Sequence, residues 1–230
     1  MSKLYVNPLP VRIWHWANAV LFIVLVVTGV QIRYLGAIDL MSFRTAVAVH
    51  NWVAFALIGN FCIWLGFYLF SDKNKAYHPE FNLLKLANAS FRQMQYYGWG
   101  IFKGERSPHQ IDPYDKFNAL QRMLYQILML FLLPLQFATG LLLWDVKRFS
   151  AVVDLVGGVR VVDTVHVLIF IFFVFYLLIH PYLATLGHTP TAHIKAMITG
   201  YEDVEDQPAV AAPVDSQRLN VNPLTTGAQA

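Results

Sequence analysis

The sequence predicts an all-α membrane protein: a four-transmembrane-helix bundle with an additional cytoplasmic interfacial helix. Three observations lead to this fold class. The chain is unusually apolar for its 230 residues, because 57% of them are hydrophobic and only 13% are charged. It contains four apolar runs that are each long enough to cross a bilayer as a helix. Two histidines, His166 and His180, lie 14 residues apart inside the last of these runs.

The four spans are expected at about residues 12–33, 46–70, 119–144 and 161–187, within one domain that covers residues 1–200. Membrane strands do not fit, because they are about ten residues long and alternate in polarity. The first run contains His15 and no small-residue cleavage site follows it, so we expect a retained span and not a signal peptide. Pro134 removes a backbone donor within the third span and predicts a bend there.

Basic residues indicate the orientation. Of the 17 Lys and Arg, twelve lie in the N-terminal stretch, in the connection 71–122 and in the C-terminal residues. The positive-inside rule therefore places both termini in the cytoplasm. Residues 201–230 start with acidic residues and continue with Pro, Ala and Ser, which predicts a flexible cytoplasmic tail. The net charge of +3 is too small to indicate a nucleic-acid partner, and the basic face suits anionic membrane lipid.

The connection between the second and third spans predicts an amphipathic helix. Apolar side chains recur in it at helical spacing: Phe81, Leu84, Ala87, Phe91 and Met94. Such a helix either lies in the cytoplasmic interface of the bilayer or caps the end of the bundle, and the spacing leaves both interpretations open.

Four histidines fall inside the predicted spans: His15, His50, His166 and His180. Fourteen helical residues cover ~21 Å and return to within about 40° of the same azimuth, so His166 and His180 share a face, with one near each membrane surface. Because consecutive spans run in opposite directions, His15 lies at the level of His180 and His50 at the level of His166. Singly, each buried histidine is more often structural than a ligand. Together they predict two imidazole pairs at opposite depths.

Two facing imidazoles are the axial ligands of a six-coordinate haem iron, so the pairs predict two haem b groups with irons ~20 Å apart. Zinc would need three or four ligands, and no Cys, Asp or Glu in the spans completes such a set. The single cysteine, Cys62, excludes an intrachain disulfide, an internal iron–sulfur cluster and covalent CxxCH attachment. Two histidine ligands leave no open coordination position, which indicates electron transfer.

Haem propionates are expected to face the two membrane surfaces, where arginines can pair with them. The cytoplasmic candidates are Arg12 and Arg122, and the periplasmic candidates are Arg33, Arg44 and Arg160. We select Arg12 and Arg44 as propionate contacts, and the alternative for each arginine is ordinary flanking charge or lipid contact.

Several segments resemble a known family. The sequence Pro-Val-Arg-Ile-Trp-His-Trp at residues 10–16 and the sequence Val27-Thr28-Gly29 are similar to the first helix of hydrogenase cytochromes. His166 and His180 match the paired ligands of that family's fourth helix, and residues 117–122 resemble the segment before the third helix of formate dehydrogenase and thiosulfate reductase subunits. The chain thus resembles the di-haem b-type cytochrome membrane subunits of bacterial respiratory oxidoreductases. Its short first outer loop, residues 34–44, departs from the hydrogenase pattern.

The resemblance implies a role in the bacterial cytoplasmic (inner) membrane. It implies that the chain is the quinone-reactive electron-transfer subunit of a multi-subunit oxidoreductase, with a periplasmic-side iron–sulfur, metalloenzyme or multihaem cytochrome subunit as its partner. It also implies a quinone beside the cytoplasmic haem, contacted by Asn118 and His180, with Gln121 and His188 as neighbours by topology. Asn118 could instead cap the third span. Two other functions remain open: a stand-alone cytochrome b electron carrier, and a transporter or anchor whose histidines relay protons.

Overall fold

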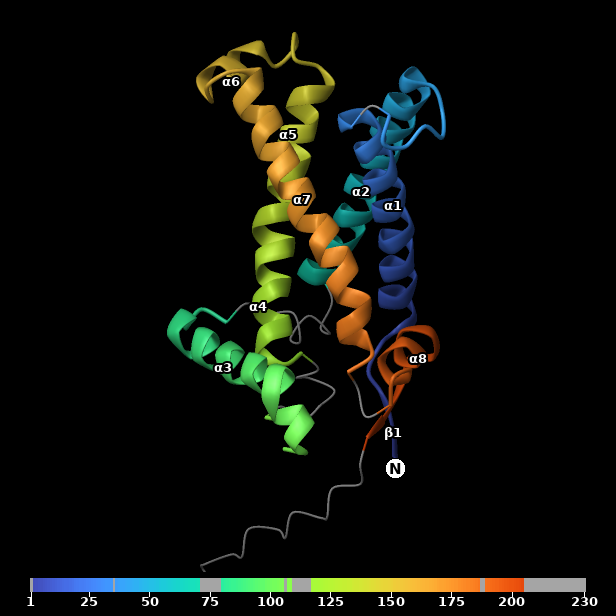
Figure 1. Ribbon diagram of the computed structural model, residues 1–230, viewed down its shortest axis with the longest axis vertical. Helices are drawn as coiled ribbons and strands as arrows, with labels where there is room; N and C mark the ends of the chain where they lie inside the picture. The colour runs from blue at the N-terminus through green and yellow to red at the C-terminus, as the bar shows by residue number, and fades with distance from the viewer. Residues whose placement is uncertain are drawn as a thin grey trace, which may run out of the picture.

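The computed structural model describes residues 2–34, 36–70, 80–105, 107–108, 117–186 and 189–204. Within these ranges, four helical segments are long and apolar enough to cross a membrane: α1 (Leu9–Arg33), α2 (Phe43–Phe70), the segment Ala119–Trp144 and α7 (Val159–Ala184). The predicted fold class, an all-α membrane bundle, is confirmed. Figure 1 shows α1 beside α2 and α5 beside α7, with the N-terminus, α3 and α8 at one end and α6 at the other.

Local sequence explains where the spans begin and end. Pro10 lies in the first turn of α1, where its missing N–H costs no helical hydrogen bond. Ser42 precedes α2 and its Oγ accepts a hydrogen bond from the Thr45 backbone N–H, at 3.2 Å. Gly158, at a φ of +91°, makes the sharp turn before α7 that residues with a Cβ rarely adopt. A proline, a serine cap and a glycine turn thus mark where these three spans begin.

The third span is not one regular α-helix. It consists of α4 (Ala119–Ile127), a π-helical turn η4 (Leu128–Leu132) and α5 (Leu133–Trp144). Pro134 lies in the first turn of α5 and has no N–H for the carbonyl four residues earlier. A π-turn is a common way for a helix to accommodate such an interruption. The disturbance predicted at Pro134 is thus present as a widened turn just before it.

The apolar side chains mostly face outward. Only 6% of the apolar window of α1 and 17% of that of α7 is buried inside the structure. A small core joins three spans, through Leu57 and Trp64 of α2, Leu133 of α5, and Ile169 and Phe173 of α7. An outward apolar surface of this extent suits lipid and not water.

Helix α3 (Leu83–Gln95) packs against α4 with its less apolar face. Leu86, Ser90 and Gln93 are buried, and Ser90 Oγ donates a hydrogen bond to the Ala119 carbonyl at 3.1 Å. The predicted apolar residues of this helix, including Phe91 and Met94, are exposed on the other side. A π-turn η2 (Tyr96–Gly100) and a 3₁₀ turn η3 (Ile101–Lys103) follow. The helix was therefore predicted correctly, and its apolar stripe points away from the bundle.

A two-stranded sheet is present that the sequence did not predict. Strand β1 (Ser2–Tyr5) pairs antiparallel with β2 (Tyr201–Val204), and the rings of Tyr5 and Tyr201 lie 5.1 Å apart between centroids. Residues 201–204 are thus ordered backbone and not the start of a flexible tail, because α8 (Ala192–Thr199) brings them beside the N-terminus. Residues 205–230 lie outside the described residues. The remaining helix, α6 (Ser150–Leu155), precedes α7.

Candidate haem-binding site

The structure brings His15 and His180 together. His15 comes from α1 and His180 from α7, and their ring centroids are 6.1 Å apart with an interplanar angle of 51°. Two imidazoles that bind one metal atom from opposite sides, each with a metal–nitrogen bond of about 2 Å, hold their ring centres about 6 Å apart. The first predicted pair therefore has the separation that an iron atom between the rings requires.

The ring nitrogens of this pair have few partners. His15 Nδ1 is buried and makes no hydrogen bond within the described residues. His180 Nδ1 lies 3.5 Å from the Tyr176 hydroxyl, at the upper limit of a hydrogen bond. The Trp16 ring meets the His15 ring edge-on, with centroids 5.3 Å apart. Within the described residues, the pair thus has few hydrogen bonds that would compete with a ligand.

The second predicted pair, His50 on α2 and His166 on α7, lies toward the other end of the bundle. Phe170, one helical turn after His166 on α7, and His50 both lie within 4 Å of the position that a Cβ atom on Gly29 would take. Each imidazole of the pair has a threonine beside its Nδ1 atom: Thr28 Oγ1 is 2.9 Å from His50 Nδ1, and Thr139 Oγ1 is 3.0 Å from His166 Nδ1. Both threonines are buried, with 1% and 6% of their surface exposed. Sequence reasoning assigned no role to either of them.

Gln136 lies on the other ring nitrogen of His166. Its Nε2 atom is 3.2 Å from His166 Nε2, and its Oε1 atom is buried without a partner among the described residues. For His166 Nε2 to bind a metal, the Gln136 amide would have to leave this position. Sequence reasoning also missed this residue, because a single glutamine in an apolar run carries no pattern.

Glycines leave room beside the second pair. A Cβ atom built on Gly140 would lie 3.3 Å from His166 Cε1, and one built on Gly29 would lie 3.6 Å from His50 Cε1 and 3.4 Å from a Phe170 ring carbon. The glycines let each imidazole pack directly against the backbone of the neighbouring helix. Two pairs of imidazoles, each from two different helices, are a donor set that would fit haem iron.

A small multi-ligand metal site does not fit the same residues. Within the described parts of the chain, no group of three or more His, Cys, Asp or Glu side chains could hold a metal ion. A structural or catalytic zinc site needs at least three such ligands. Among the described residues, the candidate metal donors are therefore the two pairs of imidazoles.

The predicted arginines lie near the ends of the spans. Arg12, close to His15 on α1, donates a hydrogen bond to the Ile198 carbonyl of α8. Arg44 is exposed near the start of α2. Arg33 Nη1 lies 3.6 Å from Asp163 Oδ2, so this arginine forms an ion pair between α1 and α7. Contacts of Arg12 and Arg44 with propionates remain predictions.

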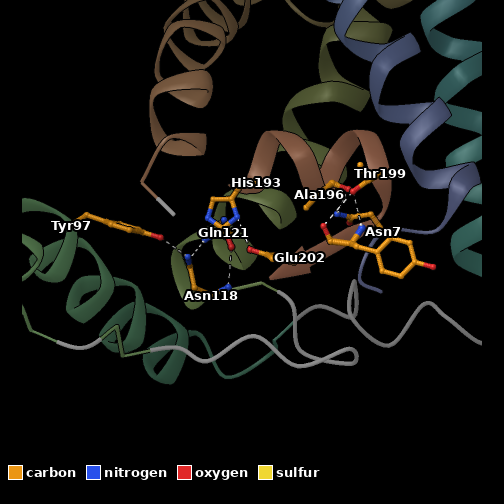
Figure 2. A network of polar contacts seen from close by, with 9 residues as sticks. Asn7, Tyr97, Asn118, Gln121, His193, Ala196, Thr199 and Glu202 are labelled. Atoms are coloured by element: carbon orange, nitrogen blue, oxygen red, sulfur yellow. Dashed lines mark hydrogen bonds and ion pairs between the residues drawn. The ribbon is translucent and has the colours of Figure 1, made fainter. Parts of the chain in front are cut away.

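Asn118 and Gln121 form the capping box of α4. Asn118 Oδ1 accepts from the Gln121 backbone N–H at 2.9 Å, and Gln121 Oε1 accepts from the Asn118 backbone N–H at 3.1 Å. Figure 2 shows that Asn118 also reaches Tyr97, whose hydroxyl oxygen accepts from Asn118 Nδ2 at 2.9 Å. Burial raises the pKa of the Tyr97 hydroxyl, so this group stays protonated. The capping role considered for Asn118 is confirmed, and its quinone role stays a prediction.

A second polar contact ties α8 to the sheet. His193 Nδ1 lies 2.8 Å from Glu202 Oε1, and Glu202 is buried (Figure 2). Three of the other histidines, His78, His109 and His188, lie outside the described residues. The predicted neighbourhood of His188 with the cytoplasmic pair is therefore not described.

Comparisons with known proteins agree with a cytochrome. The family described as prokaryotic cytochrome b561 matches residues 6–200. The protein named "Putative cytochrome YdhU" from Escherichia coli (strain K12) is 35% identical over 203 residues, which cover 87% of this chain and 75% of that protein. No solved structure matches the chain significantly. The chain belongs to the prokaryotic cytochrome b561 family and is a multi-pass membrane electron carrier of the haem b type.

Proposed function

We propose that the chain binds two haem b groups and carries electrons across the bacterial inner membrane between a periplasmic-side redox subunit and the quinone pool. His15 and His180 hold the cytoplasmic-side haem, and His50 and His166 hold the periplasmic-side haem. The observation that carries this proposal is the 6.1 Å separation of the His15 and His180 rings, which come from two different helices. Haem b, when bound, supplies a reversible one-electron iron couple.

The chain itself sets the distance between the two pairs. His166 and His180 share helix α7, and fourteen residues of helix separate them by ~21 Å along its axis. Phe173 lies seven residues from each of them and packs edge-on against Phe22 of α1, with ring centroids 5.2 Å apart. Aromatic side chains from two helices thus pack together at the level between the pairs.

We place the quinone at the end of the bundle that holds His15 and His180, with Asn118, Gln121 and His180 as its contacts. Asn118 is 5% exposed and held rigidly by its capping box. Its Nδ2 atom carries a second N–H besides the one given to Tyr97, so it can donate to a quinone carbonyl. The exposed apolar face of α3 at the same end suits the bilayer interface from which a quinone enters (Figure 1).

Orientation completes the proposal. The N-terminus and α3 lie at one end of the bundle (Figure 1). Of the twelve Lys and Arg among the described residues, seven belong to elements at this end: β1, the first turn of α1, α3, η3, α4 and α8. By the positive-inside rule, this end faces the cytoplasm. If electrons arrive from the periplasmic subunit and quinone reduction takes protons from the cytoplasm, each turnover separates charge across the membrane.

The experiment is a haem count on the purified full chain and on single variants. Wild-type protein is expected to contain two haem b per chain, and His15→Ala and His50→Ala one each, because each removes a ligand from a different pair. His109→Ala, in the connection between the second and third spans, is the matched control and keeps two. A wild-type chain with one haem or none, or a single variant that loses both while the chain stays folded, would contradict the assignment.

The same preparations test the alternatives. A reduced b-type spectrum excludes a haem-free transporter or anchor. Rapid haem reduction by an added quinol in nanodiscs supports the quinone site, and its absence removes that part of the proposal. Co-purification of a second subunit in mild detergent supports a fixed partner. A chain that is isolated alone, with full activity, supports a stand-alone carrier.

A further inference from the structure

The dipeptide Thr-Gly occurs twice beside the outer histidine pair. Thr28-Gly29 on α1 lies at His50, and Thr139-Gly140 on α5 lies at His166. In both places the threonine hydroxyl reaches Nδ1 and the glycine lies against Cε1 of the same ring. Neither α1 nor α5 supplies a ligand to this pair. Two helices therefore present the same small motif to the two imidazoles held by α2 and α7.

The threonine hydrogen bonds favour one tautomer of each histidine. Thr28 Oγ1 donates its single hydrogen to the Val24 carbonyl at 2.8 Å, and Thr139 Oγ1 donates to the Leu135 carbonyl at 2.9 Å. Each hydroxyl oxygen is then left to accept from the histidine Nδ1–H. Both rings are held with the proton on Nδ1 and the lone pair on Nε2, which is the tautomer that binds a metal through Nε2.

The inner pair lacks this arrangement. His15 Nδ1 has no hydrogen-bond partner among the described residues, and His180 Nδ1 has only the 3.5 Å contact with Tyr176. The two pairs thus present chemically different imidazoles to their irons. An Nδ1–H that donates to an acceptor makes the imidazole a stronger donor at Nε2, and a stronger donor favours the oxidised iron.

We propose that Thr28 and Thr139 are positioning residues that lower the reduction potential of the outer haem relative to the inner one. This inference rests on the proposed function, because it requires His50 and His166 to be ligands. With both haems bound, a lower outer potential would favour electron transfer from the outer haem to the inner one. The chain then contains a built-in preference for electron flow from the periplasmic side toward the cytoplasmic side.

The test is an optical redox titration of both haems in the full chain, purified and placed in nanodiscs. His50→Ala identifies the signal of the outer haem by removing it. Thr28→Val and Thr139→Val keep the side-chain volume and remove the acceptor. At a fixed potential, each is expected to raise the reduced-to-oxidised ratio of the outer haem about three- to tenfold, where tenfold corresponds to about 59 mV for a one-electron couple. The inner haem is expected to titrate as in the wild type.

Matched variants separate this role from simple packing. Thr28→Ser and Thr139→Ser keep the hydroxyl and are expected to keep the wild-type ratio of reduced to oxidised outer haem. Thr164→Val is the control. Thr164 Oγ1 donates the same kind of hydrogen bond to the Arg160 carbonyl, at 2.8 Å, on the exposed side of α7. This variant is expected to leave the reduction potentials of both haems unchanged. If a valine variant loses the outer haem, retention of that haem in the serine variant supports the proposal, and loss in both overturns it.

An unchanged outer potential in both valine variants, or equal shifts of both haems, also overturns the inference. These outcomes leave the proposed function intact, because two haems are still bound. A wild-type chain without an outer haem, or one whose outer haem survives His50→Ala, is instead a failure of the proposed function.

Discussion

Asn118 offers a test that separates helix capping from quinone binding. Asn118→Ala removes the side-chain acceptor for the Gln121 N–H and the donor to Tyr97. Loss of an N-cap costs about 1 kcal/mol, and an unmade hydrogen bond to a half-buried hydroxyl costs about 1 kcal/mol more. Asn118→Ser keeps an N-cap oxygen and loses only the amide donor. The alanine variant is therefore expected to lose about 2 kcal/mol of stability and the serine variant about 1 kcal/mol.

The assay has two readouts on the purified protein: unfolding in detergent, and the quinol concentration dependence of haem reduction. If the Asn118 amide binds quinone, both variants raise the KM for quinol to a similar extent, although their stabilities differ. The control is Asn82, whose Oδ1 caps α3 by accepting from the Lys85 N–H at 3.0 Å. Asn82→Ala is expected to reduce stability without changing quinol kinetics. Wild-type kinetics in Asn118→Ser would refute the quinone role and leave Asn118 as a cap.

Three further predictions concern the haem pocket, pH and topology. Gly140→Val places a branched side chain against the ring of His166 and is expected to reduce the haem count to about one per chain. Gly66→Val is the control, because a Cβ there meets nothing within 4 Å, and it is expected to keep the wild-type haem count. Equal haem counts in the two variants would contradict the expected crowding of His166. Because the pKa of Tyr97 is raised on folding, its contribution to stability is fully present below the pKa of the unfolded chain, about 10, and is lost as pH rises through the pKa of the folded protein. Stability is therefore expected to fall less steeply with alkaline pH in Tyr97→Phe. Identical curves of stability against pH for the variant and the wild type would contradict this. Reporter fusions to the two termini are expected to be active only on the cytoplasmic side, and a periplasmic signal from either would reverse the assigned orientation.

Much of the helical bundle could be predicted from the sequence, because the transmembrane helices depend on the length and periodicity of the apolar runs. Four apolar runs and the alternation of span direction were enough to place His15 beside His180. The distance between two positions on one helix follows directly from the helical rise. The helix at residues 83–95 was also predictable, because its apolar stripe has helical spacing.

The remaining features depend on contacts that no local pattern reports. Strands β1 and β2 are far apart in the sequence and pair only because the bundle brings the two ends together. Threonines such as Thr28 and Thr139 satisfy an i−4 carbonyl in many membrane helices, so their second contact with a histidine appears only in three dimensions. The sequence contains Thr-Gly four times, and the two copies inside predicted spans could have indicated this contact.

Residues with two possible roles also needed the structure. Asn118 is suited both to a cap and to a polar binding site, and the sequence left both roles open. The structure shows the capping box and the bond to Tyr97, which explains why the residue is buried. Its use by a quinone requires the kinetic experiment described above.

The location of the irons tests the central claim most directly. Anomalous diffraction at the iron edge from crystals of the purified chain gives their positions independently of any assumed ligand. Two iron peaks per chain are predicted, one between the rings of His15 and His180 and one between those of His50 and His166. A single peak, or a peak away from these imidazoles, would contradict the account.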